Sequence, residues 1–166
     1  VMKFLRVFLM LLVVPIAWTD TNTGYSLGNE AIRVVFESVH GGLVSLVELR
    51  DGRQMLQNDA AAGCPLWRLE LEETPALSLA PDRARECVCE VSGDALRLIW
   101  RGFGVDAAPE LTVEATASIA PALPEIRWRI AVSNLGKLAA KELHFPYIGW
   151  MARQSGETLA VPNWTG

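Results

Sequence analysis

The sequence predicts an all-β protein built as an antiparallel sandwich. Downstream of residue 30, apolar residues recur with a period of two, which is typical of strands with one covered face. The apolar segments are short and bounded by Gly, Pro, Asn or Asp. Many short strands without intervening helices favour a sandwich or barrel.

The N-terminus has the pattern of a secretory signal peptide. Lys3 and Arg6 precede an apolar run over residues 7–16, and polar residues 19–22 follow. About ten apolar residues are too few to span a bilayer, which requires about twenty. We therefore expect a signal peptide over residues 1–19, one β-sandwich domain over residues 20–166, and a secreted or periplasmic product that leaves the membrane. An uncleaved anchor or a buried first strand is the alternative.

The charge of the expected mature chain disfavours nucleic acid as a partner. Without Lys3 and Arg6, 13 of the 15 basic residues remain against 19 acidic ones, which gives a net charge of −6. This sign repels a phosphate backbone. Neutral ligands remain compatible with the sequence.

The first half of the chain predicts two hairpins and a lone strand. Residues 32–36 form a strand, the sequence His40-Gly41-Gly42 turns the chain, and Asp51-Gly52 closes a hairpin between residues 43–50 and 54–56. A strand over residues 66–72 places Trp67, Leu69 and Leu71 on one face. Residues 74–85, with two prolines, form a connection.

The second half continues the same pattern. A hairpin joins residues 86–91 to 95–103, and a long half-buried pair joins residues 111–119 to 124–132. Strands over residues 138–148 and 158–161 follow. The alternation predicts that Trp67, Trp100 and Trp128 lie in the core.

The three cysteines allow one disulfide at most. Cys87 and Cys89 share a strand face and cannot easily bridge each other. Cys64 could pair with one of them. We favour the alternative, in which all three cysteines are buried free thiols. The spacing does not match a metal site, and the sequence predicts no cofactor.

No catalytic residue is assignable from the sequence. His40 is expected in a turn and His144 in a strand, and neither belongs to a nucleophile motif. Glu70 and Glu72 lie along one segment, whereas glycoside chemistry needs two acids across a cleft. Trp150 and Trp164 do not follow the alternation of the apolar core residues. These two tryptophans and His144 are therefore the candidate sugar-contacting residues.

Several segments carry a resemblance to galactose-mutarotase-like β-supersandwich domains. They are LGNEAIRVVF (27–36), GGLVSL (41–46), PLWRLEL (65–71), PEIRWRI (124–130) and FPYIG (145–149). The likeness covers about residues 25–166 and is greatest to N-terminal domains of large secreted bacterial proteins of the glycoside-hydrolase type. In those, a (β/α)8 barrel follows and holds the catalytic acids. The His and Glu of the aldose epimerases match no position here.

The resemblance implies a noncatalytic N-terminal sandwich that supports a catalytic barrel encoded beyond Gly166, with carbohydrate as the ligand of the whole protein. Two alternatives remain open at this point. One is a free-standing carbohydrate-binding module, and the other is a structural sandwich on the cell surface.

Overall fold

The computed structural model describes residues 19–20, 24–56, 64–73, 75–121 and 123–149. Strands account for the regular structure of these residues apart from one 3₁₀ turn, η1 (Pro81–Arg83). Every strand pairing is antiparallel. The predicted all-β antiparallel class is therefore confirmed. Among the described residues, no helix is long and apolar enough to cross a membrane.

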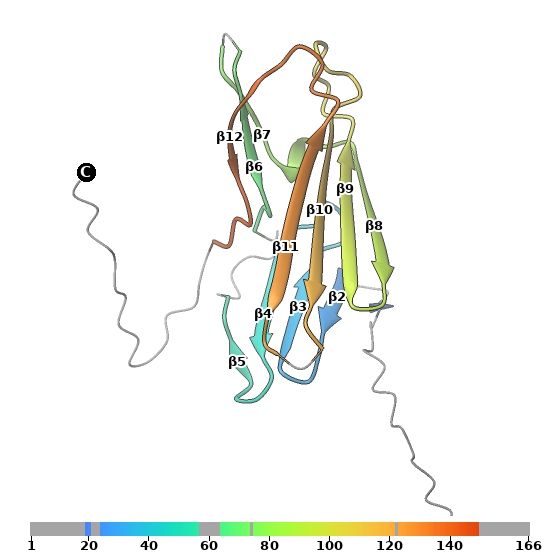
Figure 1. Ribbon diagram of the computed structural model, residues 1–166, viewed down its shortest axis with the longest axis vertical. Helices are drawn as coiled ribbons and strands as arrows, with labels where there is room; N and C mark the ends of the chain where they lie inside the picture. The colour runs from blue at the N-terminus through green and yellow to red at the C-terminus, as the bar shows by residue number, and fades with distance from the viewer. Residues whose placement is uncertain (1–18, 21–23, 57–63, 74, 122, 150–166) are drawn as a thin grey trace, which may run out of the picture.

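One layer of the sandwich is a four-stranded sheet that runs along much of the molecule (Figure 1). Its strand order is β11-β10-β9-β8, so each strand pairs with its neighbour in the sequence. The strands are β8 (Glu86–Ser92), β9 (Ala95–Arg101), β10 (Thr112–Ile119) and β11 (Ile126–Ser133). Consecutive pairing of this kind requires only short connections.

The other layer consists of two separate sheets, one above the other in Figure 1. The lower sheet contains β1 (Thr19–Asp20), β2 (Gly24–Gly28), β3 (Ile32–Phe36), β4 (Leu43–Glu48) and β5 (Arg53–Gln54) in sequence order. The upper sheet has the order β12-β6-β7, from β6 (Arg68–Leu71), β7 (Leu77–Leu79) and β12 (Ala140–His144). A bridge between Leu43 and Cys64 connects the two regions.

The core lies between the layers and follows the alternation of the strands. In β10, Val113, Ala115, Ala117 and Ile119 are buried, and the residues between them are half-buried. Trp67 is fully buried. Its ring centroid lies 5.6 Å from that of Trp100 and 5.8 Å from that of Phe103, and both ring pairs are edge to face. Edge-to-face aromatic pairs stabilise a core beyond the burial of their area.

Asn29 fastens the two layers together at one end. Its side-chain oxygen accepts the backbone N–H groups of Ala31 and Ile32 at 2.8 and 2.9 Å, which shapes the turn between β2 and β3. Its Nδ2 donates to the carbonyls of Ala120 and Leu123, at 2.7 and 2.8 Å, in the turn between β10 and β11. One side chain thus satisfies backbone groups from both layers.

Trp128 differs from the other two core tryptophans. Trp67 and Trp100 are fully buried, as predicted, but Trp128 is only half-buried. The predicted face is correct, because Trp128 is opposite Ala117, whose side chain points into the core. However, β11 is the edge strand of its sheet, so one side of the indole lacks a neighbouring strand.

Some predicted boundaries also differ from the structure. β7 lies within the segment predicted as a connection, where Leu77–Leu79 pairs with β6 between two prolines that flank the strand. The strand predicted over residues 138–148 ends at His144, shortly before Pro146, which cannot donate to a ladder. The predicted strand over residues 158–161 lies outside the described residues, as do residues 1–18 of the signal peptide predicted over residues 1–19.

All three cysteines are free, in agreement with the favoured prediction. Cys64 is fully buried, whereas Cys87 and Cys89 are half-buried. The sequence had suggested that all three would be buried, but β8 is an edge strand, which leaves its inward side chains partly open to solvent.

Candidate functional site

Of the three candidate sugar-contacting residues, only His144 lies in the described part of the chain; Trp150 and Trp164 lie outside it. His144 is the last residue of β12, in which every residue is exposed. In the register with β6, His144 is opposite Arg68 and Glu142 is opposite Glu70. These four side chains therefore share the outer face of the upper sheet.

The outer face of this sheet contains two pairs of neighbouring polar side chains. Nε2 of His144 lies 3.1 Å from Oε1 of Glu142, and Nε of Arg68 lies 3.8 Å from Oε1 of Glu70. The His144 and Glu142 side chains are 46% and 58% exposed. Such a pair can hydrogen-bond a ligand hydroxyl. Its position on an open sheet face suits binding better than bond cleavage, which requires reacting groups on both sides of the substrate.

Partly uncovered apolar side chains lie on the two edge strands β11 and β12 and in the segment that follows β12. The ring centroid of Trp128 lies 6.0 Å from that of the buried Phe36 and 6.1 Å from that of Phe145. Leu143 is opposite the buried Leu69, yet it remains 38% exposed because β12 is an edge strand.

The neighbouring Tyr147 is 47% exposed. We use the name open flank for these partly covered or exposed apolar residues of β11, of β12 and of the segment after β12. They are Trp128, Ile130, Leu143, Phe145 and Tyr147.

Several carboxylates elsewhere have structural roles. Glu114 and Glu90 both bind Arg97, at 2.7 and 2.8 Å, on the outer face of the four-stranded sheet. The hydrogen bond from Arg97 lowers the pKa of Glu114, so this group stays ionised at neutral pH and is unsuited to act as a general acid. Glu48 binds Arg53 at 2.6 Å, and Glu125 binds Arg127 at 2.9 Å.

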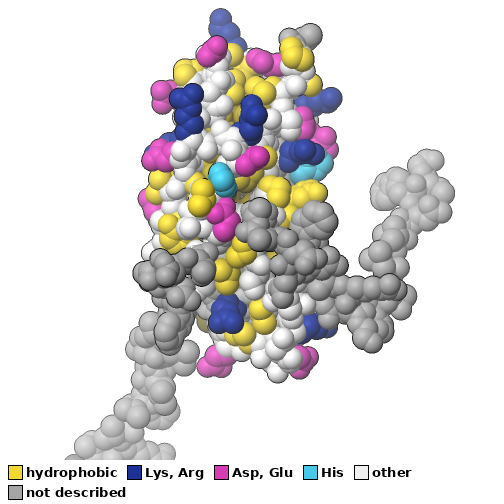
Figure 2. Space-filling model, turned by 180° about the vertical axis from the view of Figure 1, so that it is seen from behind, with side chains coloured by type: hydrophobic (Ala, Val, Ile, Leu, Met, Phe, Trp, Pro, Cys, Tyr) yellow, Lys and Arg dark blue, Asp and Glu magenta, His cyan; other side chains and the backbone are white. Residues whose placement is uncertain are grey.

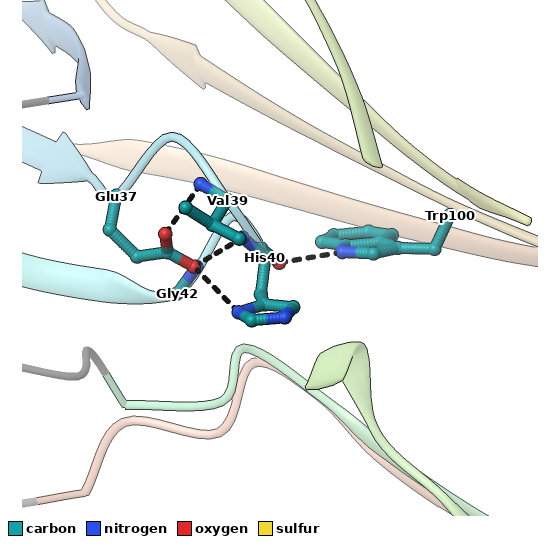
Figure 3. Close-up of polar contacts among 5 residues, drawn as sticks. All are labelled: Glu37, Val39, His40, Gly42 and Trp100. Carbon is teal, nitrogen blue, oxygen red and sulfur yellow. Dashed lines mark hydrogen bonds and ion pairs between the residues drawn. The ribbon is translucent and has the colours of Figure 1, made fainter. Parts of the chain in front are cut away.

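His40 lies in a turn, as predicted, and the turn is held by Glu37 (Figure 3). The Glu37 carboxylate accepts the backbone N–H groups of Val39, His40 and Gly42 at 2.6, 2.5 and 3.1 Å. The indole nitrogen of Trp100 donates to the carbonyl oxygen of His40 at 2.7 Å. Nδ1 of His40 lies 3.8 Å from Oε1 of Glu37, which is longer than the hydrogen bonds to the backbone. The main contacts of Glu37 and Trp100 therefore go to the backbone of the turn, and they organise its shape.

A cavity of about 320 Å³ lies near the end of β7, beside η1 and the loop that follows β9. No local sequence pattern indicates this cavity, because its walls come from three separate segments. Leu79 and Phe103 contribute apolar surface, while Arg83 and Asp106 contribute opposite charges. The lining residues are Glu73, Leu77, Leu79, Arg83, Phe103, Gly104, Val105, Asp106 and Ala107.

The charged surface is mixed in sign. Figure 2, which shows the side opposite to Figure 1, has basic and acidic side chains interspersed over the upper part of the molecule. A mixed surface of this kind does not concentrate a field on a polyanion. Among the described residues, no group of three or more His, Cys, Asp or Glu side chains is arranged to hold a metal ion.

Comparisons with known proteins give no assignment. No protein-family model matches the chain, and no curated protein is significantly similar to it.

Proposed function

We propose that this chain is the noncatalytic β-sandwich of a secreted carbohydrate-active enzyme, and that the sandwich supports a catalytic domain of the glycoside-hydrolase type. The galactose-mutarotase-like relationship is part of this proposal. The observation that carries it is the open flank, where apolar side chains that face inward remain incompletely covered.

The open flank has the properties of a surface that receives another part of the protein. Its two edge strands, β11 and β12, offer backbone hydrogen-bonding groups beside exposed apolar side chains. Leu143 and Tyr147 are among the exposed large hydrophobic residues of the described chain. Tyr147 of the flank also lies near Gly149, the last described residue, since a Cβ built at Gly149 would be 3.4 Å from the Tyr147 ring.

A free-standing carbohydrate-binding module is less well supported. Such a module stacks sugars on exposed aromatic rings, usually on one sheet face. The described tryptophans Trp67, Trp100 and Trp128 instead pack against the core. Tyr147 is the exposed aromatic residue of the described chain, and it follows β12 rather than lying on a sheet face.

The proposal is tested by comparing two products of the natural gene. One is this chain, and the other is a longer polypeptide that also includes the coding sequence after codon 166. Both are assayed against aryl glycosides and oligosaccharides. The longer product should hydrolyse a substrate, and the chain alone should not. A natural gene that stops at codon 166 would contradict the proposal, as would turnover by the chain alone that His144→Ala abolishes.

A matched pair of variants tests the flank itself. Leu143→Ser alters the open flank, where the leucine is 38% exposed. Leu49→Ser alters a leucine of similar exposure, 36%, directly after β4. In the chain alone, both changes should leave the melting temperature nearly unchanged. In the longer product, Leu143→Ser should lower it by at least about 2 °C, because the leucine is then covered. Equal effects of the two substitutions in the longer product would argue against docking at this flank.

A further inference from the structure

Two thiols lie on the same face of the edge strand β8. Cys87 is opposite Trp100 and Cys89 is opposite Leu98, both of which point into the core. The two cysteines accordingly pack against the core while remaining half-buried. Because β8 ends its sheet, the thiols are reachable from the side of the sandwich.

The opposite layer places Tyr25 of β2 close to both thiols. Burial raises the pKa of the Tyr25 hydroxyl, and so do its electrostatic interactions with Cys89 and Cys87. Glu37 interacts with Cys87, and Glu90, on the same strand, interacts with Cys89. The thiol pair therefore sits at an edge opening between the layers and has defined neighbours.

The spacing of the pair prevents a disulfide but suits a bridging ion. Alternate residues of a strand lie about 6.6 Å apart, whereas a disulfide needs Cβ atoms within about 4.5 Å and sulfurs at about 2.05 Å. A metal ion bound in line by two thiolates needs sulfurs about 4.6 Å apart, given metal–sulfur bonds of about 2.3 Å. Rotation of two side chains on one strand face can supply the longer separation.

We propose that Cys87 and Cys89 form a two-coordinate site for a soft monovalent cation of the Cu(I) or Ag(I) class, which does not need the third and fourth ligands that the cysteine spacing fails to supply. Thiolates select soft ions of this kind, and two ligands complete a linear coordination. In the binding step, two S–H bonds are broken and two sulfur–metal bonds form, so the free ion enters and two protons leave. No oxidation or reduction takes place. This site is independent of the proposed role in carbohydrate metabolism.

The surroundings determine how binding depends on pH. Burial raises the pKa of each thiol to about 12, with Glu37 adding to the effect at Cys87, and Cys87 and Glu90 adding to it at Cys89. Both thiols are therefore protonated at neutral pH, and the ion must displace both protons. Affinity should rise steeply as the pH increases. The thiols should also react slowly with alkylating reagents in the absence of the ion.

The site is tested by titrating the reduced chain anaerobically with Cu(I) held by a coloured chelator. Binding of one ion per chain with release of two protons is expected. Cys87→Ser and Cys89→Ser should each reduce the affinity by about 100-fold or more, since each removes half of the ligands.

Cys64→Ser is the matched control. Cys64 is a buried cysteine that pairs with Leu43 in a β-bridge, and its Sγ accepts a hydrogen bond from Gly149 N at 3.3 Å. It does not belong to β8, so its replacement should leave the affinity unchanged. A Cys87→Ser/Cys89→Ser double variant that still binds one ion would overturn the proposal. Loss of binding in the Cys64 variant, with circular dichroism showing a retained fold, would overturn it as well.

Discussion

The indole nitrogen of Trp100 donates a 2.7 Å hydrogen bond to the carbonyl oxygen of His40, which ties β9 to the turn between β3 and β4 in the opposite layer. Trp67, whose ring packs directly against that of Trp100, has no such partner. Among the described residues, its Nε1 is the buried side-chain polar atom without a hydrogen bond. Two neighbouring and equally buried tryptophans thus differ in whether the N–H group is used.

This difference predicts unequal costs for the same substitution at the two positions. Trp100→Phe leaves the His40 carbonyl without its donor and should lower the free energy of unfolding by about 1–3 kcal/mol beyond the loss of ring volume. Trp67→Phe removes an unpaired donor, so the gain offsets part of the cost of the smaller ring. Urea denaturation of both variants measures the contrast. The interpretation fails if Trp67→Phe is the more damaging change.

Glu37 provides a second test of the same turn. Glu37→Ala removes the acceptor of three backbone N–H groups and should cost about 1–3 kcal/mol of unfolding free energy. Glu37→Gln keeps one acceptor oxygen and should fall between the parent and the alanine variant. The exposed Glu30 is the control, since Glu30→Ala should change stability by less than about 0.5 kcal/mol. Equal stability of the Glu37→Ala and Glu30→Ala variants would show that water replaces the carboxylate without cost.

Two glycines with positive φ differ in the space around them. A Cβ at Gly24 (φ 144°) would lie 1.9 Å from the carbonyl oxygen of Phe36, whereas a Cβ at Gly52 (φ 64°) would meet nothing within 4 Å. Gly52→Ala should cost only the strain of the left-handed backbone, about 1 kcal/mol. Gly24→Ala must also displace the backbone of β3 and should cost several times more. Thermal unfolding compares the two, and similar melting temperatures would contradict the predicted clash.

The alternation of β10 shows what the sequence can specify on its own. The five-stranded and three-stranded sheets that form the opposite layer could not be placed from the sequence. Val113, Ala115 and Ala117 could nevertheless be assigned to the core, because a period of two determines which face of the strand each residue occupies. The burial of Trp128 was overestimated, since alternation identifies a face and not whether a neighbouring strand covers it.

The residues that organise sites were harder to predict. The role of Glu37 depends on three N–H groups that converge only after the turn has formed, although an acid shortly before His40-Gly41-Gly42 is a usable signal. The proximity of Tyr25 to the β8 thiols depends on how two layers pack, which no local pattern contains. Local periodicity therefore recovers faces, and tertiary packing decides coverage and contacts.

The last prediction concerns Arg97, which lies between Glu90 and Glu114 on the outer face of the four-stranded sheet. The hydrogen bond from Arg97 lowers the pKa of Glu114, and both acidic partners raise the pKa of Arg97, which stays cationic throughout. A carboxyl whose pKa is lower in the folded chain than in the unfolded chain stabilises the fold above the unfolded value, which is about 4.3 for Glu. That contribution is lost as the pH falls through the folded value.

Arg97→Gln should therefore reduce stability slightly at pH 7, and the difference from the parent should shrink as the pH falls from about 5 to about 2. The effect is small because the pair is exposed to solvent, and added salt should weaken it further. Arg129→Gln is the matched control: Arg129 lies opposite Thr116 in the same cross-strand row, and among the described residues it forms no ion pair. Urea titrations of the parent and both variants at pH 7 and pH 3 measure the dependence. A gap between parent and Arg97→Gln that widens toward pH 3 would have the wrong sign for a lowered Glu114 pKa, and would mean that Arg97 stabilises the sheet by packing over its strands instead of by its charge.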